Sequence, residues 1–114
     1  MTRDAADRFL PLHADAFRIL TALSESELHG YALVKQLESG DGTGRKVLPA
    51  NLYRRIRTLL DQGLIEESDH RPDPELDDER RRYFRATELG LSVARAEAER
   101  MRALLDGASG LLTP

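Results

Sequence analysis

The chain has 114 residues, of which 40% are hydrophobic and 32% charged, and its formal net charge at pH 7 is −3. The length is typical of one globular domain, the absence of cysteine excludes a disulfide framework and a thiolate metal site, and the net charge excludes a general attraction to polyanions. No apolar run approaches the roughly 20 residues that cross a bilayer, and no signal-peptide core follows Met1, so a cytoplasmic protein with no membrane partner is expected.

Two amphipathic helices are predicted in the first third of the chain. The first covers residues 12–23, where apolar side chains recur at steps of three and four along one helix face: Leu12, Ala16, Ile19, Leu20 and Leu23. The segment SESEL at residues 24–28 ends this pattern, and a second helix is predicted from His29 to Glu38. Residues 39–44, SGDGTG, are expected to form a loop because three glycines lie there among small polar residues.

A third helix is predicted to begin at Pro49, whose missing N–H group costs nothing in a first turn, and to be capped by Gly63. At 100° per residue its apolar residues form one stripe, which consists of Leu52, Ile56, Leu59 and Leu60. The opposite face consists of Asn51, Arg54, Arg55 and Thr58, with Tyr53 and Arg57 on the flank.

The face opposite that stripe has the chemistry of a nucleic-acid contact. From Arg45 to Leu60 the chain has five basic residues and no acidic one. An arginine can bond a guanine edge, an asparagine an adenine edge, and either can bind a phosphate oxygen. A charged face that is merely solvated is the alternative, but such faces usually mix both signs. The sequence therefore favours contact with nucleic acid.

Two short strands and one long helix are predicted after Gly63. The strands are residues 64–68 and 81–86, and the segment between them, HRPDPELDDE, is expected to be an exposed loop because of its prolines and acids. Thr87 is a good N-cap for a helix over residues 88–106. The last residues, 107–114, are expected to be a flexible tail.

The resulting order is helix, helix, helix, strand, strand, helix. This order predicts a mainly α fold with a small β-hairpin, namely a winged helix-turn-helix in which the third helix enters the major groove. Residues 1–87 would form the winged-helix DNA-binding domain, and residues 88–106 a C-terminal dimerisation helix.

Three short motifs carry a resemblance to a known family. They are HGYAL at residues 29–33, PANLY at 49–53 with LDQGLI at 60–65, and RYFRATELG at 82–90. In this order they resemble the PadR family of winged-helix transcriptional regulators over residues 12–106. The chain is similar to the short-form members, which have one long C-terminal helix. It departs from the family at Leu48, where a serine is common, and at Ala86, where a leucine is usual.

The resemblance implies a repressor that binds a palindromic operator in double-stranded DNA as a homodimer. It also allows an unidentified small-molecule effector as a further partner. Together with the basic face it assigns these DNA-binding residues: Lys46, Ala50, Asn51, Tyr53, Arg54, Arg55, Thr58, Arg80, Arg81 and Arg82.

The long last helix carries its own apolar stripe. A three-helix head with a small hairpin leaves little surface to cover it, so burial against a second subunit is expected. The predicted dimer interface consists of Leu12, Leu89, Val93, Ala96, Met101 and Leu104. The alternative is that the stripe folds back on its own domain.

The two predicted strands 64–68 and 81–86 and the loop between them form the wing, and its acidic residues support a competing interpretation. From Glu66 to Glu79 there are eight carboxylates against the single Arg71. Beside DNA they would repel phosphates and suppress non-specific binding. They could instead be the contact surface of a protein-interaction module that kept the fold and lost DNA binding.

No catalytic, cofactor or metal site is predicted. The three histidines have neither helical pairing nor cysteine partners, and His29 is interpreted as a structural residue at a helix start. The glycines of residues 40–44 lack the Lys-Ser/Thr that follows a phosphate-binding loop. An enzyme is therefore not expected.

Overall fold

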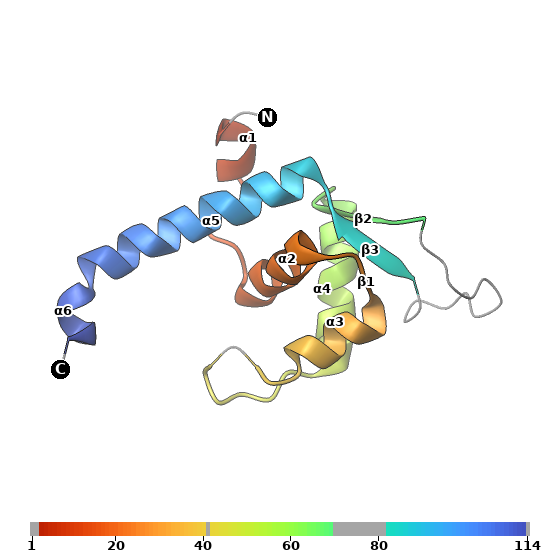
Figure 1. Ribbon diagram of the computed structural model, residues 1–114, viewed down its shortest axis with the longest axis horizontal. Coiled ribbons are helices and arrows are strands. Elements are labelled where there is room, and N and C mark those ends of the chain that lie inside the picture. The colour runs from red at the N-terminus through yellow and green to blue at the C-terminus, as the bar shows by residue number, and fades with distance from the viewer. Residues whose placement is uncertain (1–2, 41, 70–81, 114) are drawn as a thin grey trace.

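The computed structural model describes residues 3–40, 42–69 and 82–113 (Figure 1). Its helices are α1 (Arg3–Asp7), α2 (Ala14–Glu25), α3 (Gly30–Leu37), α4 (Pro49–Asp61), α5 (Glu88–Gly107) and α6 (Ser109–Leu112). Its strands are β1 (Leu28–His29), β2 (Ile65–Glu67) and β3 (Tyr83–Ala86). The mainly helical winged-helix fold expected from the sequence is confirmed.

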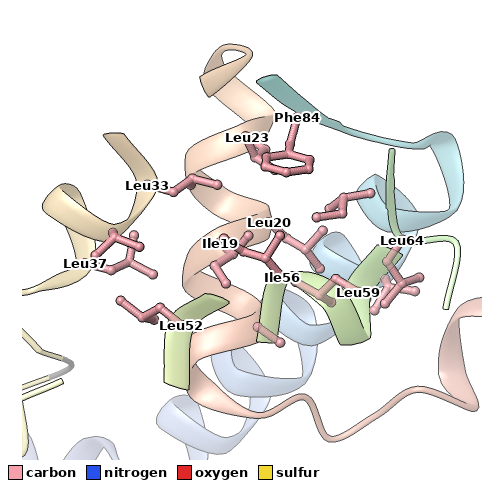
Figure 2. Close-up of a cluster of buried hydrophobic side chains, with 14 of the residues drawn as sticks. Ile19, Leu20, Leu23, Leu33, Leu37, Leu52, Ile56, Leu59, Leu64 and Phe84 are labelled. Atoms are coloured by element: carbon pink, nitrogen blue, oxygen red, sulfur yellow. The ribbon is translucent and has the colours of Figure 1, made fainter. Parts of the chain in front are cut away.

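The hydrophobic core is built around α2, which contacts α3, α4, α5 and β3. Ile19 and Leu20 are completely buried at its centre (Figure 2). The predicted stripe of α4 packs against them with Leu52, Ile56 and Leu59, all buried. The other labelled side chains of this core are Leu23, Leu33, Leu37, Leu64 and Phe84. The opposite face of α4 is thereby turned away from the core.

The wing belongs to a three-stranded antiparallel sheet with the order β1-β3-β2. β2 pairs with β3 in the register Ile65↔Ala86, and β1 pairs with β3 in the register Leu28↔Phe84. The two-stranded wing expected from the sequence is confirmed as β2 and β3, and β1 adds a third strand to the sheet that the sequence did not predict. β1 has only two residues, so it shows no alternating pattern. From the sequence alone, Leu28 is therefore assigned to the segment that ends the first predicted helix.

Gly63 ends α4 as predicted. It has φ +75°, its N–H donates to the carbonyl of Leu60 at 3.1 Å, and the N–H of Leu64 donates to the carbonyl of Leu59 at 3.0 Å. These two bonds form a Schellman motif, which requires a left-handed residue at this position. The start of α4 has Pro49 in its first turn and no side-chain cap from Leu48.

The start of α5 is fastened to the end of α4. The hydroxyl of Thr87 accepts from the N–H of Gly90 at 3.0 Å and donates to the carbonyl of Gly63 at 2.7 Å. The N–H of Thr87 also donates to the carbonyl of Leu64 at 3.1 Å. At Gly90 the helix passes so close that an added Cβ would lie 1.9 Å from the oxygen of Leu64.

The first half of α5 is buried within its own chain. Val93 is completely buried, Ala96 is nearly so, and both belong to the core cluster. Leu12 and Leu89 are partly buried against the same cluster. The interface role predicted for Val93 and Ala96 therefore does not fit this arrangement, because their side chains are already covered by the rest of the chain.

Helix α1, which the sequence did not reveal, packs against α5 and buries Ala6. Beyond the buried half, α5 projects from the body of the molecule with α6 at its tip (Figure 1). The tail expected to be flexible thus contains a short helix, Ser109–Leu112. The division into a DNA-binding domain and a dimerisation helix stays a prediction.

Candidate nucleic-acid interface

The exposed face of α4 brings four of the predicted DNA-binding residues together. Asn51 and Arg54 are exposed, while Arg55 and Thr58 are half-buried. Nη1 of Arg54 donates to Oδ1 of Asn51 at 3.3 Å, and the hydroxyl of Thr58 donates to the carbonyl of Arg54 at 3.1 Å. The two hydrogen bonds link Asn51, Arg54 and Thr58 along about two turns of the helix.

A groove of about 340 Å³ runs between this face and the start of α2. Its lining consists of His13, Asp15, Asn51, Arg54, Arg55 and Thr58. His13 is the N-cap of α2, and its Nδ1 accepts from the N–H of Asp15 at 3.1 Å. Two elements far apart in the sequence therefore share one polar surface.

Two guanidinium groups of α4, those of Arg54 and Arg55, have no carboxylate partner in the part of the chain that the structure describes. Among the described residues, no carboxylate lies within 4.0 Å of the guanidinium nitrogens of Arg54 or Arg55. The carboxylate of Asp15, which lines the same groove, lies 4.0 Å from both Arg18 and His13 on its own helix. The groove thus presents two cations that no described carboxylate pairs with, together with several hydrogen-bond donors, which suits a polyanion.

The remaining predicted residues of this region lie at the edges of that face. Ala50 is exposed in the first turn of α4, and Tyr53 is half-buried and packs against the core. Lys46 is exposed in the loop before α4. It lines a wider hollow of about 730 Å³ between α3 and α4, together with Lys35, Glu38, Ser39, Val47, Leu48 and Pro49.

At the base of the wing, the structure pairs arginines with carboxylates. Arg80, Arg81 and most of the acidic loop lie outside the described residues. Nε of Arg82 lies 3.9 Å from a carboxylate oxygen of Glu67. Arg85 donates to Glu66 at 2.8 Å, and this hydrogen bond is the main reason that the pKa of Arg85 is raised. These pairs compete with phosphate for the two arginines.

His29 links the start of α3 to the sheet, in agreement with its interpretation as a structural residue. Its Nδ1 accepts from the N–H of Ala32 at 2.9 Å, which makes it the N-cap of α3. Its ring packs edge-on against Tyr83, with the centroids 5.3 Å apart. The N–H of Gly30 donates to the carbonyl of Arg82 at 3.1 Å and completes the link.

Sequence reasoning missed the part of the groove that comes from α2. His13 and Asp15 are far from α4 in the sequence, and the helix stripe that includes Leu12 gave no reason to separate them from ordinary surface residues. The sequence did contain one local signal for this part of the groove, namely two polar residues at the start of α2: His13 at the N-cap and Asp15 in the first turn. Such a pair marks a helix start, but it does not say which surface that start lies beside.

The described residues hold no group of three or more His, Cys, Asp or Glu side chains able to bind a metal ion. In the same part of the chain, no helix has the length and apolar character needed to span a bilayer.

Comparisons with known proteins identify a family for the chain and relatives with the same fold. The model of the transcriptional regulator PadR-like family matches residues 19–96. No curated protein matches the chain. Solved structures that share the fold include the following three. A PadR family transcription regulator from Clostridium difficile R20291 has a TM-score of 0.70 and 16% identity, covering 89% of this chain and 100% of that one.

A PadR-like transcriptional regulator from Bacillus cereus strain ATCC 14579 has a TM-score of 0.66 and 22% identity, covering 87% and 91%. ZitR from Lactococcus lactis has a TM-score of 0.62 and 23% identity, and the match covers 88% of this chain but only 60% of ZitR. The family match extends from α2 to the buried half of α5 and includes the whole of α4. The chain therefore belongs to the PadR-like family of transcriptional regulators.

Proposed function

We propose that the chain is a cytoplasmic, sequence-specific DNA-binding repressor whose helix α4 enters the major groove. The observation that carries this proposal is the unmixed polar face of α4. Its core stripe fixes the helix, and Asn51, Arg54 and Arg55 lie on the outward side without a carboxylate partner among the described residues. Arginine and asparagine are the side chains that read guanine and adenine edges.

A homodimer is the second part of the proposal. The far end of α5 and α6 expose large apolar side chains, of which Leu104 is 60% and Leu111 87% exposed. Met101 extends this surface toward the body, and the exposed Leu105 lies next to Leu104 within it. A second copy of the same helix pair would cover it and place two α4 helices on two half-sites of a palindrome.

The experiment starts from DNA chosen by the protein itself. A duplex is selected from a random pool with the wild-type chain, and its affinity is measured by fluorescence anisotropy at several salt concentrations. Arg54→Ala and Arg55→Ala are compared with Arg95→Ala, a matched change of an exposed arginine on α5. We expect at least fivefold loss for one α4 variant and none for Arg95→Ala.

The outcome also separates the repressor from a protein-interaction module. A module that lost DNA binding would select no sequence from the pool, and all three arginine variants would behave like the wild type. A reporter gene placed behind the selected site tests repression directly. Its expression should fall when the wild-type chain is present and recover with the impaired α4 variant.

A further inference from the structure

We propose that the groove between α2 and α4 holds a phosphate of the DNA backbone, with His13 as a contact residue supplied by α2. This inference rests on the proposed DNA binding by α4 and extends it to a second helix. The groove is lined from both sides, by His13 and Asp15 from α2 and by the polar face of α4.

His13 offers a hydrogen-bond donor to this groove. Its Nδ1 accepts from the backbone N–H of Asp15 at 3.1 Å, so it carries no proton there. In a neutral imidazole the proton is then on Nε2, which makes Nε2 a donor. The His13 side chain is 52% exposed, so a ligand can approach it. The helix cap thus fixes which ring nitrogen is available for a ligand.

The other groups of the groove favour an anion. Arg54 and Arg55 contribute guanidinium donors, and no described carboxylate pairs with them. Asp15 is the carboxylate among the described residues that line the groove; its side chain is 18% exposed and lies 4.0 Å from Arg18. Its charge is thus partly balanced outside the groove. A phosphate oxygen can accept from a histidine and an arginine together, whereas a base edge offers fewer acceptors in one place.

The position of His13 beside α4 indicates that the phosphate belongs to the DNA backbone. In helix-turn-helix complexes the helix in the major groove reads bases, and elements beside it cross the backbone. His13 is such a neighbour, because it lies next to the α4 face but belongs to α2. With α4 in the groove of DNA, we expect His13 to meet the strand that borders it.

The test uses His13→Asp and His13→Asn, which keep a side-chain cap for α2, and His13→Ala, which removes both the cap and the donor. Asp is a good N-cap, so His13→Asp should preserve α2 while replacing the donor by a carboxylate that repels phosphate. Affinity for the selected duplex should fall about five- to tenfold for His13→Asp and about threefold or more for His13→Ala. His13→Asn, which retains both a cap and a donor, should lie between these variants and the wild type.

A second measurement locates the contact. Duplexes are prepared that each carry one uncharged methylphosphonate linkage. At one linkage the wild type and Arg95→Ala should lose affinity, whereas His13→Ala should lose little, because its contact is already absent. Equal responses of wild type and His13→Ala at every linkage would overturn the proposal.

A wrong assignment of His13 and a wrong assignment of DNA binding give different experimental results. If the wild type selects DNA and the α4 arginine variants bind weakly, but all His13 variants bind like the wild type, His13 is no contact and α4 still is. If the wild type selects no sequence, the proposed function itself fails and the His13 proposal falls with it. Far-UV circular dichroism of each variant verifies that α2 is intact.

Discussion

The carboxylate of Glu97 accepts a hydrogen bond of 2.7 Å from the backbone N–H of Leu12, a residue 85 positions away in the sequence. Glu97 is 1% exposed and also accepts from Nε of Arg100. This hydrogen bond from Arg100 is the main cause that lowers the pKa of Glu97, and it prevails over burial, which raises it. A buried anion therefore ties the segment before α2 to α5.

Removing this carboxylate should destabilise the fold. Glu97→Ala leaves the N–H of Leu12 without its acceptor, and we expect a loss of about 1–3 kcal/mol in the free energy of unfolding at pH 7. Glu97→Gln should cost less, because its amide oxygen can still accept from Leu12. Urea denaturation measures both. Glu25→Gln, an exposed change at the end of α2, is the control and should be close to neutral.

The same carboxylate gives a pH dependence of defined sign. The pKa of Glu97 in the folded chain is below its ordinary value of 4.5, so folding favours the ionised form. Its contribution is fully present above pH 4.5 and is lost as the pH falls through the lower, folded-state pKa. The stability difference between wild type and Glu97→Gln should thus shrink below pH 4.5. A constant difference down to pH 3 would contradict this assignment.

Two substitutions on α5 should separate folding from assembly. Val93 is completely buried, so Val93→Asp places a charge in the core and should abolish cooperative unfolding. Leu104 is 60% exposed, so Leu104→Asp should keep the helical circular dichroism spectrum and dissociate the proposed dimer.

Sedimentation equilibrium at micromolar concentration measures the second effect. Leu48→Asp changes another exposed leucine, on the loop before α4, and should leave the mass unchanged. A wild-type chain that sediments as a monomer would remove the basis for the dimer.

Three glycines should respond differently to alanine. At Gly90 a Cβ would lie 1.9 Å from the oxygen of Leu64, a backbone atom, so α5 or the segment between α4 and β2 must shift. We expect Gly90→Ala to cost more than about 3 kcal/mol, the range of strong core disruption. At Gly63 the space is open but φ is +75°, so Gly63→Ala should cost about 1 kcal/mol.

Gly107 is the matched control for these two changes. It lies at the end of α5 with nothing near an added Cβ and an ordinary φ. Because alanine favours a helix more than glycine does, Gly107→Ala should be neutral or stabilise by up to about 1 kcal/mol. Thermal unfolding of the three variants gives the order. A Gly90→Ala protein as stable as Gly107→Ala would exclude the close backbone crossing.

Asn51 should contribute to recognition through its amide. Asn51→Ala removes a potential base contact and should weaken binding to the selected duplex by about 1–3 kcal/mol. Asn51→Asp keeps the size and the acceptor for Arg54, but adds a negative charge that draws Arg54 away from DNA. We therefore expect Asn51→Asp to bind more weakly than Asn51→Ala. The opposite order, measured by anisotropy, would place Asn51 outside the interface.

The sequence alone was enough to predict which face of α4 is exposed, but it was not enough to predict what covers the apolar face of α5. In α4 the apolar residues Leu52, Ile56 and Leu59 repeat with the helix period, and the period alone tells which face is outward. In α5 the same kind of period identified an apolar stripe through Val93 and Ala96, but a stripe does not tell what covers it. The chain's own core covers these two residues.

The remaining differences concern short elements and long-range contacts. The strand β1 has two residues, which is below the length at which alternation can be recognised. Neither the neighbourhood of His13 and α4 nor the bond between Glu97 and Leu12 follows from local spacing, because each joins segments that only the folded chain brings together.

The close approach of Gly90 to the Leu64 carbonyl fixes the point at which α5 crosses the segment after α4. The helix has 20 residues and is therefore about 30 Å long, and near its start it rests on the backbone oxygen that follows the end of α4. At this crossing, main-chain atoms of Gly90 and Leu64 meet directly, so the start of α5 and the segment that ends α4 cannot shift independently of one another.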